Sequence, residues 1–195
     1  GETLITGIGQ GYTLTTPIQL CLMTAQIANG GYKIQPKILT DDNQLTSEQV
    51  KKAMEDSKSN DFYEPLYDDQ KNIRIIQEAM FSSTNEIMGT SYKSRIDDPK
   101  YQFAGKTGTA QVKRISKRER ELDLKTFQIP YEERDHALYV AYGPYTNPRY
   151  ALSIIVEHGG SGSAAAAPMA TKLFKLIVDR HEYRKQLPEY KDFSI

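Results

Sequence analysis

YQFAGKTGTAQVK, residues 101–113, combines strand-forming residues with two internal glycines. Its aromatic and β-branched residues favour an extended conformation. A glycine inside a strand often marks a place where a ligand or another backbone approaches closely. Between and beside these glycines lie Lys106, Thr107 and Thr109, which offer one ammonium and two hydroxyl groups. The stretch therefore predicts an exposed β-edge that can hold an anion.

The rest of the chain has the size and composition of one domain with a core of its own. Its 195 residues include 25 basic and 25 acidic side chains, so the net charge is zero. The chain therefore has no long-range electrostatic attraction to nucleic acid or to an anionic membrane. The sequence shows no apolar run long enough for a bilayer and no signal-like start. The single Cys21 excludes an internal disulfide, and three scattered histidines show no metal-ligand spacing. We therefore expect no metal and no cofactor.

The start of the chain predicts a polar loop followed by a helix. Residues 1–16 contain glycines at alternate positions, but they lack the spacing and the preceding strand of a dinucleotide-binding motif. Thr15 or Thr16 suits the N-cap of a helix over 17–29. Apolar residues lie on two of its faces, so we expect burial on most sides. Cys21 is then a small core residue rather than a nucleophile.

Two more helices are predicted. One covers about 69–87 and ends at Gly89; its apolar residues share one face: Ile73, Ile76 and Met80. The other follows GGSGSAAAAP, residues 159–168, where small side chains leave room for a ligand or for close approach of helix and sheet. We expect this helix to end near residue 180, before a polar and loosely held tail over 181–195.

The fold class predicted is α+β, an antiparallel sheet flanked by helices. HALYVAYG at 136–143 and RYALSIIVEH at 149–158 are strands joined by a turn, and they place residues 101–113 in a three-stranded antiparallel sheet. Residues 32–39 also look extended.

Two polar stretches interrupt this pattern. Residues 40–67 are interpreted as an insertion or long loop, with a short surface helix from Thr46 to Met54. Residues 114–135 carry dense charge of both signs, which is typical of a solvated connection; a docking surface for a partner is the alternative.

Seven sequence blocks resemble the penicillin-binding transpeptidases and occur in the same order as in that family. Within the family they are most similar to the class B, monofunctional, elongation-specific group of penicillin-binding protein 2. The resemblance covers residues 1 to about 180. The blocks are GIGQGY (7–12), TPIQL (16–20), IANGG (27–31), AGKTGTAQV (104–112), HALYVAYGPY (136–145), NPRYALSIIVEHGG (147–160) and GSAAAAP (162–168).

This resemblance implies a peptidoglycan D,D-transpeptidase, a cell-wall acyltransferase that β-lactams target. It implies that the backbone N–H of Thr109 is one oxyanion donor. Lys106, Thr107 and Thr109 would bind the terminal carboxylate of the substrate, with Lys106 as the local positive charge. Gly108 would allow the substrate backbone to approach like a strand.

The family's other motifs are not found in their setting. No S-x-x-K occurs in these residues, so the chain contains no nucleophile of that kind. Ser83-Thr84-Asn85 fits the S-x-N triplet as a string, but it lies late in a predicted helix and after the GQGY block, and is interpreted as unrelated. We therefore expect residues 1–180 to be the C-terminal part of the transpeptidase domain, inactive alone. In the family, the preceding portion carries the membrane anchor, a pedestal and the first half of the catalytic domain.

The resemblance also implies partners and a location. The intact protein would lie on the periplasmic face of the bacterial inner membrane and bind peptidoglycan stem peptides and β-lactams. It would work with a SEDS-type glycosyltransferase and other elongation-complex proteins. The balanced charge of the chain predicts no nucleic-acid partner. Without the first half of its domain, the chain is expected to expose apolar surface on its first helix and sheet, which predicts self-association.

Three other interpretations stay open. A non-enzymatic penicillin-sensing receptor domain has the same fold and K-T-G strand. A serine hydrolase is suggested by His158-Gly159-Gly160 beside Ser161, although GGSGS is not G-x-S-x-G; otherwise His158 is a strand-end residue near the rim of the site. A purely structural module would leave Lys106 and its strand unexplained.

Overall fold

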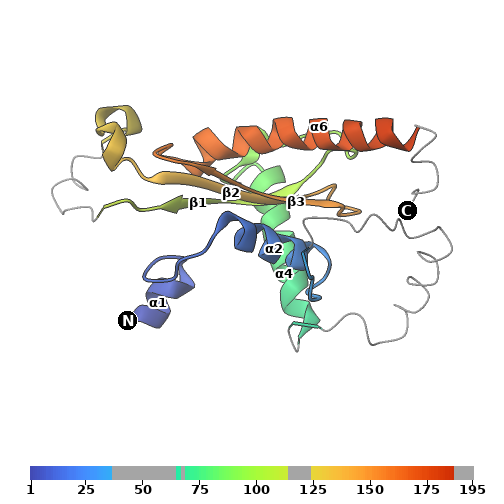
Figure 1. Cartoon of the computed structure of the whole chain (residues 1–195), viewed down its shortest axis with the longest axis horizontal. Coiled ribbons are helices and arrows are strands. Elements are labelled where there is room, and N and C mark those ends of the chain that lie inside the picture. Colours follow the sequence, from blue (N-terminus) through green and yellow to red (C-terminus); the bar gives the residue numbers. More distant parts are fainter. Residues whose placement is uncertain (37–64, 67–68, 114–123, 187–195) are drawn as a thin grey trace.

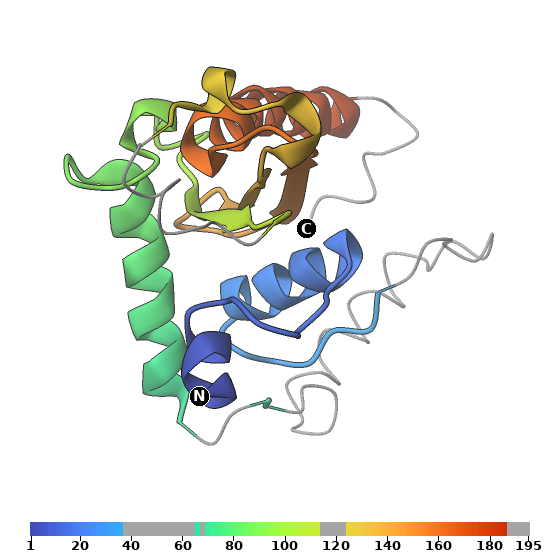
Figure 2. The same ribbon diagram turned by 90° about the vertical axis from the view of Figure 1, so that its left-hand side faces the viewer.

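The computed structural model describes residues 1–36, 65–66, 69–113 and 124–186. A three-stranded sheet lies between helical layers (Figure 1). Helix α6 (Ala167–Lys185) covers one face and α2 (Pro17–Ala28) lies across the other. Helix α4 (Gln70–Asn85) passes beside the sheet and past α2, down to the level of α1 (Figure 2). The strand that lies beside α4 is at one edge of the sheet.

The sheet confirms the predicted strands and their antiparallel order. Strands β1 (Ala104–Ala110), β2 (His136–Gly143) and β3 (Tyr150–Val156) are neighbours in chain order. Lys106 is paired with Val140 of β2. β1 is an edge strand, since no strand of the described residues pairs with its other side.

The face of the sheet under α6 carries the larger core. Phe103 and Tyr139 are fully buried there, and the Phe103 ring stacks on Phe174 of α6 with centroids 4.8 Å apart. The small residues serve close helix–sheet approach: the π-helical turn Gly162–Ala166 leads into α6, and a β-carbon on Gly162 would collide with strand carbonyl oxygens. α6 continues to Lys185, so the prediction that it ends near residue 180 is wrong.

The other face is packed by α2 and α4. Met80 of α4 joins Ala104 and Tyr142 in a second buried cluster. The predicted face of α4 needs correction, because Ile76 is 41% exposed whereas Ile73 and Met80 are buried. Ile76 lies at the border of the stripe that these two residues form at helical spacing. The helix also ends at Asn85, four residues before Gly89.

Helix α2 begins as predicted but is less buried than predicted. Thr16 is its N-cap, in a reciprocal capping box with Gln19, and two glycines with positive φ follow its end. However, Ile18 is 63% exposed and Met23 is also exposed. The expectation of burial on most sides is therefore wrong, because only one side of α2 meets the sheet and α4 within the described residues.

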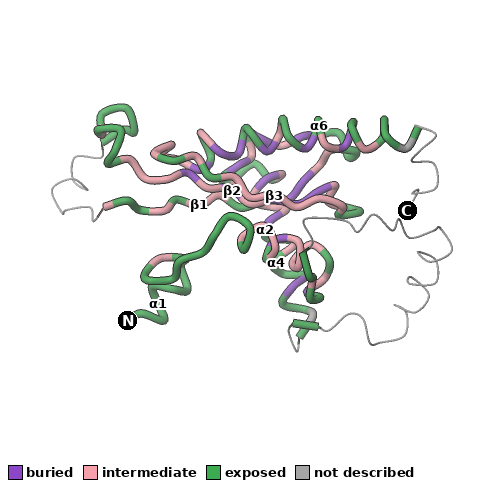
Figure 3. The backbone as a smooth tube through the Cα atoms, viewed as in Figure 1, coloured by how far each residue is buried: buried purple, intermediate pink, exposed green. Residues whose placement is uncertain are grey.

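The predicted N-terminal loop contains a helix, α1 (Glu2–Gly7). Residues 2–6 hold no glycine or proline, so nothing in them prevents a helical turn. Apolar side chains in this region face solvent, with Leu4 80% and Leu14 93% exposed (green in Figure 3). These side chains lie outside the helix over 17–29 and the sheet, where uncovered apolar surface is expected; on that helix Ile18 is exposed. Self-association stays a prediction.

The polar stretches lie largely outside the described residues. That includes 37–64, with the short helix expected from Thr46 to Met54, and 114–123. Tyr32 forms an isolated bridge with Pro65, and 124–135 contains two 3₁₀ turns, Thr126–Gln128 and Tyr131–Glu133. Among the helices that the structure describes, none is long and apolar enough to cross a membrane.

Candidate functional site

The free edge of β1 is met by side chains from several elements. Four carbonyl oxygens at alternate positions each accept a side-chain hydrogen bond: Phe103 from Asn85 (2.9 Å), Gly105 from Thr84 (3.4 Å), Thr107 from Lys106 (2.8 Å) and Thr109 from Gln10 (3.3 Å). A residue in an extended strand directs its N–H and C=O to the same side. The N–H of Thr109 therefore also faces this free edge.

Lys106 lies exposed beside an open hollow. Its side chain follows the strand edge, so that Nζ donates to the Thr107 carbonyl oxygen and lies 3.5 Å from Thr107 Oγ1. The hollow holds about 280 Å³ and is lined by Lys106 together with the end of α4 and the loop after it: Ser82, Ser83, Glu86, Met88, Gly89 and Thr90. The ammonium is thus accessible to a ligand and is not part of a packed core.

Thr107 and Thr109 share one face of β1, and Lys106 and Gly108 the other, because side chains alternate along a strand. Thr107 Oγ1 lies 3.1 Å from Thr90 Oγ1. A β-carbon on Gly108 would lie 3.3 Å from the β-carbon of Leu138, a tight contact on the neighbouring strand. The structure brings the predicted Lys106 ammonium, Thr107 hydroxyl and Thr109 N–H to one edge, and their roles toward a substrate belong to the proposal below.

A buried hydroxyl cluster behind β1 was missed in the sequence. Tyr139 Oη lies 2.9 Å from Thr84 Oγ1 and donates to Ser91 Oγ at 3.0 Å. Burial raises the pKa of Tyr139, against an opposing effect of these hydrogen bonds, so the phenol is neutral.

Ser83-Thr84-Asn85, at the end of α4, lies beside the candidate site, where two of its side chains hydrogen-bond the backbone next to Lys106. Thr84 and Asn85 bond the carbonyl oxygens of Gly105 and Phe103. A signal was present in the sequence: Thr84 continues the buried stripe of α4 at helical spacing from Met80.

The histidine alternative finds no support. His158 lies just past the end of β3, where its N–H donates to His136 Nδ1 at 3.0 Å and its own Nδ1 lies 3.0 Å from the Arg134 carbonyl oxygen. Ser161 Oγ instead contacts Ser163 Oγ at 2.9 Å. The hydrogen bonds of His158 and Ser161 therefore do not join them into a hydrolase site. His158 thus lies in the turn that follows β3, two residues beyond the end of the strand. That it lies near the rim of the site stays a prediction.

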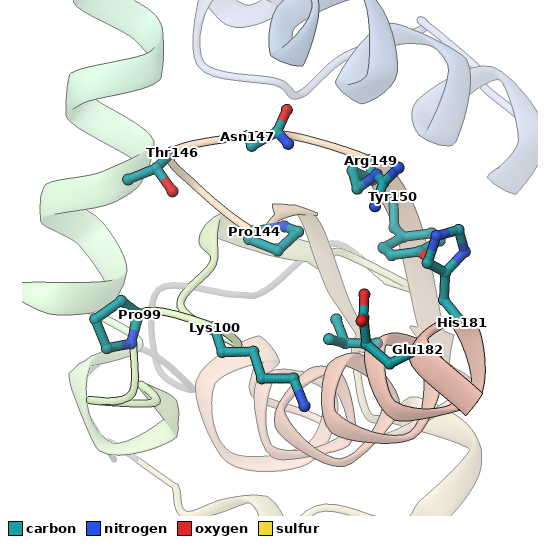
Figure 4. Close-up of a pocket in the computed structure, with 10 residues that line it drawn as sticks. Pro99, Lys100, Pro144, Thr146, Asn147, Arg149, Tyr150, His181 and Glu182 are labelled. Atoms are coloured by element: carbon teal, nitrogen blue, oxygen red, sulfur yellow. The ribbon is translucent and has the colours of Figure 1, made fainter. Parts of the chain in front are cut away.

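A second hollow, of about 390 Å³, lies around the turn between β2 and β3 and the end of α6 (Figure 4). Near this hollow, Lys100 and Tyr101 form hydrogen bonds with Asp179 of α6. Lys100 Nζ lies 3.0 Å and Tyr101 Oη 2.6 Å from Asp179 Oδ1. These two hydrogen bonds lower the pKa of Asp179. None of Lys106 to Thr109 lines this hollow, so it is separate from the candidate site.

No group of three or more histidine, cysteine, aspartate or glutamate side chains that could hold a metal ion occurs in the described ranges.

Known proteins share this sequence pattern. The profile of the penicillin binding protein transpeptidase domain matches residues 1–175. Peptidoglycan D,D-transpeptidase MrdA of Haemophilus influenzae is 31% identical over 205 aligned residues, which take in 100% of this chain and 29% of that protein. The MrdA protein of Acinetobacter baumannii is 36% identical over 87% of this chain and 24% of its own length. This chain therefore spans less than a third of these relatives.

Solved structures show the same arrangement. Penicillin-binding protein PBP2 of Helicobacter pylori, in complex with MreC, matches 92% of this chain and 28% of its own chain at a TM-score of 0.69 and 28% identity. PBP2 of Pseudomonas aeruginosa, in complex with WCK 5153, matches 90% of this chain and 33% of its own at a TM-score of 0.60 and 33% identity.

Proposed function

This chain belongs to the penicillin-binding protein transpeptidase domain family, and on that basis we propose that it supplies the K-T-G half of a peptidoglycan D,D-transpeptidase site. The observation that carries the proposal is the free edge of β1: the Lys106 ammonium lies close to the Thr107 hydroxyl, and Lys106 lines an open hollow. The Thr109 N–H faces the same edge further along the strand. The relatives named D,D-transpeptidases support the enzyme, and no observation favours a non-enzymatic penicillin receptor.

The proposed reaction is an acyl transfer from a serine that is not among these 195 residues. The serine oxygen attacks the carbonyl carbon of the penultimate D-Ala, the peptide bond to the terminal D-Ala breaks, and that residue leaves with the proton on its amine. An amine of a neighbouring strand then attacks the ester, and the serine leaves with its proton restored. A β-lactam acylates the same serine but is released slowly.

Each group of the β1 edge has a proposed part in this reaction. The Thr109 N–H donates to the carbonyl oxygen as negative charge develops on it. Lys106, Thr107 and Thr109 hold the terminal carboxylate through charge-assisted hydrogen bonds, which are shorter and stronger than neutral ones. Gly108 presents no side chain, so an extended peptide can lie antiparallel to the strand edge.

The proposal extends to partners and location. Peptidoglycan stem peptides and β-lactams are the ligands, and the intact enzyme acts in cell-shape maintenance at the periplasmic face of the inner membrane. A SEDS-type glycosyltransferase and other elongation-complex proteins are the proposed partners. The complex of the Helicobacter pylori relative with MreC supports a protein partner for this family.

Labelling with a fluorescent penicillin tests the proposal. An enzyme that contains these residues together with an S-x-x-K serine is expected to keep the label after denaturation. The 195-residue chain alone is expected to stay unlabelled, because it contains no S-x-x-K. A covalent label on the chain alone, or an enzyme that is never labelled, would show the proposal to be wrong.

A further inference from the structure

The loop after α4 is held at a defined place beside β1. It folds back over the end of the helix, where the Ser91 N–H donates to the Ser83 carbonyl oxygen at 3.0 Å and the Gly89 N–H to that of Glu86 at 2.8 Å. A β-carbon on Gly89 would collide with backbone carbonyl oxygens at the helix end, so only glycine lets the loop lie this close. Thr90, between these anchored residues, therefore projects from a constrained backbone.

Thr90 is the middle member of a row of three hydroxyl groups. Ser83 Oγ lies 3.2 Å from Thr90 Oγ1, which lies 3.1 Å from Thr107 Oγ1. The row ends at the lysine-bearing edge, where Lys106 Nζ is 3.5 Å from the same Thr107 oxygen. Ser83 is on α4, Thr90 on the loop and Thr107 on β1, so the row joins three separate segments of the chain.

The direction of these hydrogen bonds decides what Thr107 can offer a ligand. A hydroxyl has one proton to donate. If Thr90 donates to Thr107, the proton of Thr107 is left for an anion beyond it. An anion at the end of the row favours this direction, because each donated bond polarises the next hydroxyl toward the negative charge.

We propose that Thr90 is a positioning residue: its hydroxyl donates to Thr107 and holds the Thr107 proton toward the carboxylate of the substrate or β-lactam. This inference rests on the proposed function and adds a residue outside the K-T-G motif to it. Thr90 itself is exposed and lies in a loop, so its side chain can be changed without opening a cavity in the core.

The test compares Thr90→Val with Thr90→Ser in the enzyme that contains these residues and the serine nucleophile. Acylation rates are measured with benzylpenicillin and with its methyl ester, in which the carboxylate charge is removed. Thr90→Val keeps the shape but loses the hydroxyl, and is expected to slow acylation by benzylpenicillin about 3- to 10-fold, the effect of one net hydrogen bond. Thr90→Ser restores the hydroxyl and is expected to stay within about twofold of the parent.

With the methyl ester, Thr90→Val and the parent are expected to react at the same rate, because no carboxylate is there to be held. The matched control is Thr146→Val, an exposed threonine in the turn between β2 and β3, which should leave both rates unchanged. An unchanged rate for Thr90→Val, an equal loss with both compounds, or no rescue by serine would each overturn the inference. Lys106→Ala is measured in the same series to test the proposed function separately. If the parent is not acylated, or if Lys106→Ala is acylated as fast as the parent, the proposed function of the β1 edge is wrong, whatever Thr90→Val does.

Discussion

The phenol ring of Tyr139 fills the space in which a β-carbon on Gly105 would stand. Gly105 is buried in β1, and the Tyr139 hydroxyl beside it is bonded to Thr84 and Ser91. The glycine that begins the G-K-T-G run therefore has a packing reason as well as a proposed use at the edge: it allows a fully buried tyrosine to lie against the strand.

Replacing Gly105 by alanine is expected to lower the free energy of unfolding by about 1–3 kcal/mol or more, because an extra methyl group must displace a buried ring. Chemical denaturation followed by circular dichroism measures the change. Gly7→Ala is the matched control, since Gly7 ends α1 and a β-carbon added there would meet no atom within 4 Å. Equal midpoints for the two variants would contradict the packing account.

The contacts of Asp179 predict a pH dependence of stability. Its hydrogen bonds from Tyr101 and Lys100 lower its pKa in the folded chain. The carboxylate thus stabilises the fold at pH values above the ordinary aspartate pKa of about 3.9, and this contribution is lost as pH falls through the lower folded-state value. Because the group is exposed, the effect is expected to be small.

Asp179→Asn should therefore unfold at a slightly lower temperature than the parent at pH 7, and the difference should shrink as the pH falls below about 4. Thermal denaturation over a pH series measures this. Glu78→Gln removes a carboxylate from an exposed position of α4 and serves as the control. A difference between Asp179→Asn and the parent that stays constant down to the acid limit would rule out the linkage.

Cys21 is expected to react slowly with thiol reagents. Burial raises its pKa, and its Sγ lies 3.4 Å from the Ala151 carbonyl oxygen between α2 and β3. A raised pKa leaves less thiolate, the reactive form, at neutral pH. Alkylation by iodoacetamide at pH 7.5, followed by mass spectrometry, should be several-fold slower in the native chain than in denaturant. Equal rates would show that the thiol is neither buried nor perturbed.

The strands and the K-T-G edge were predictable because their signals are local. Alternating side chains and flanking turn residues define β1 to β3, and Lys106 to Thr109 lie next to one another in the sequence. Burial was less predictable. The apolar pattern of α2 shows two faces that are suited to burial, but it does not show which of them packs against the rest of the chain. In the structure Ile18 faces solvent. α1 was missed because the glycines that suggested a loop begin only at the helix end, at Gly7.

The groups that surround the edge could not be found in the same way. Gln10 meets Thr109 across 99 positions of the chain, and Thr90 meets Thr107 across 17. Nothing in the local pattern of either segment indicates such a contact, because it arises only when α4 and the N-terminal segment pack beside β1. The same holds for Ser83-Thr84-Asn85. The sequence of this triplet does not show that the Asn85 side chain donates a hydrogen bond to the Phe103 carbonyl oxygen.

The central claim is that the Lys106 ammonium at the free edge of β1 holds a carboxylate next to the reacting carbonyl group. The most direct test is the acylation rate of Lys106→Ala by a fluorescent penicillin, measured in the enzyme that contains these residues and the serine, with Lys172→Ala on the exposed side of α6 as control. The account predicts a loss of about 10²–10³ for Lys106→Ala, as for other preorganised electrostatic groups, and none for the control. A rate within a few-fold of the parent for Lys106→Ala would contradict it.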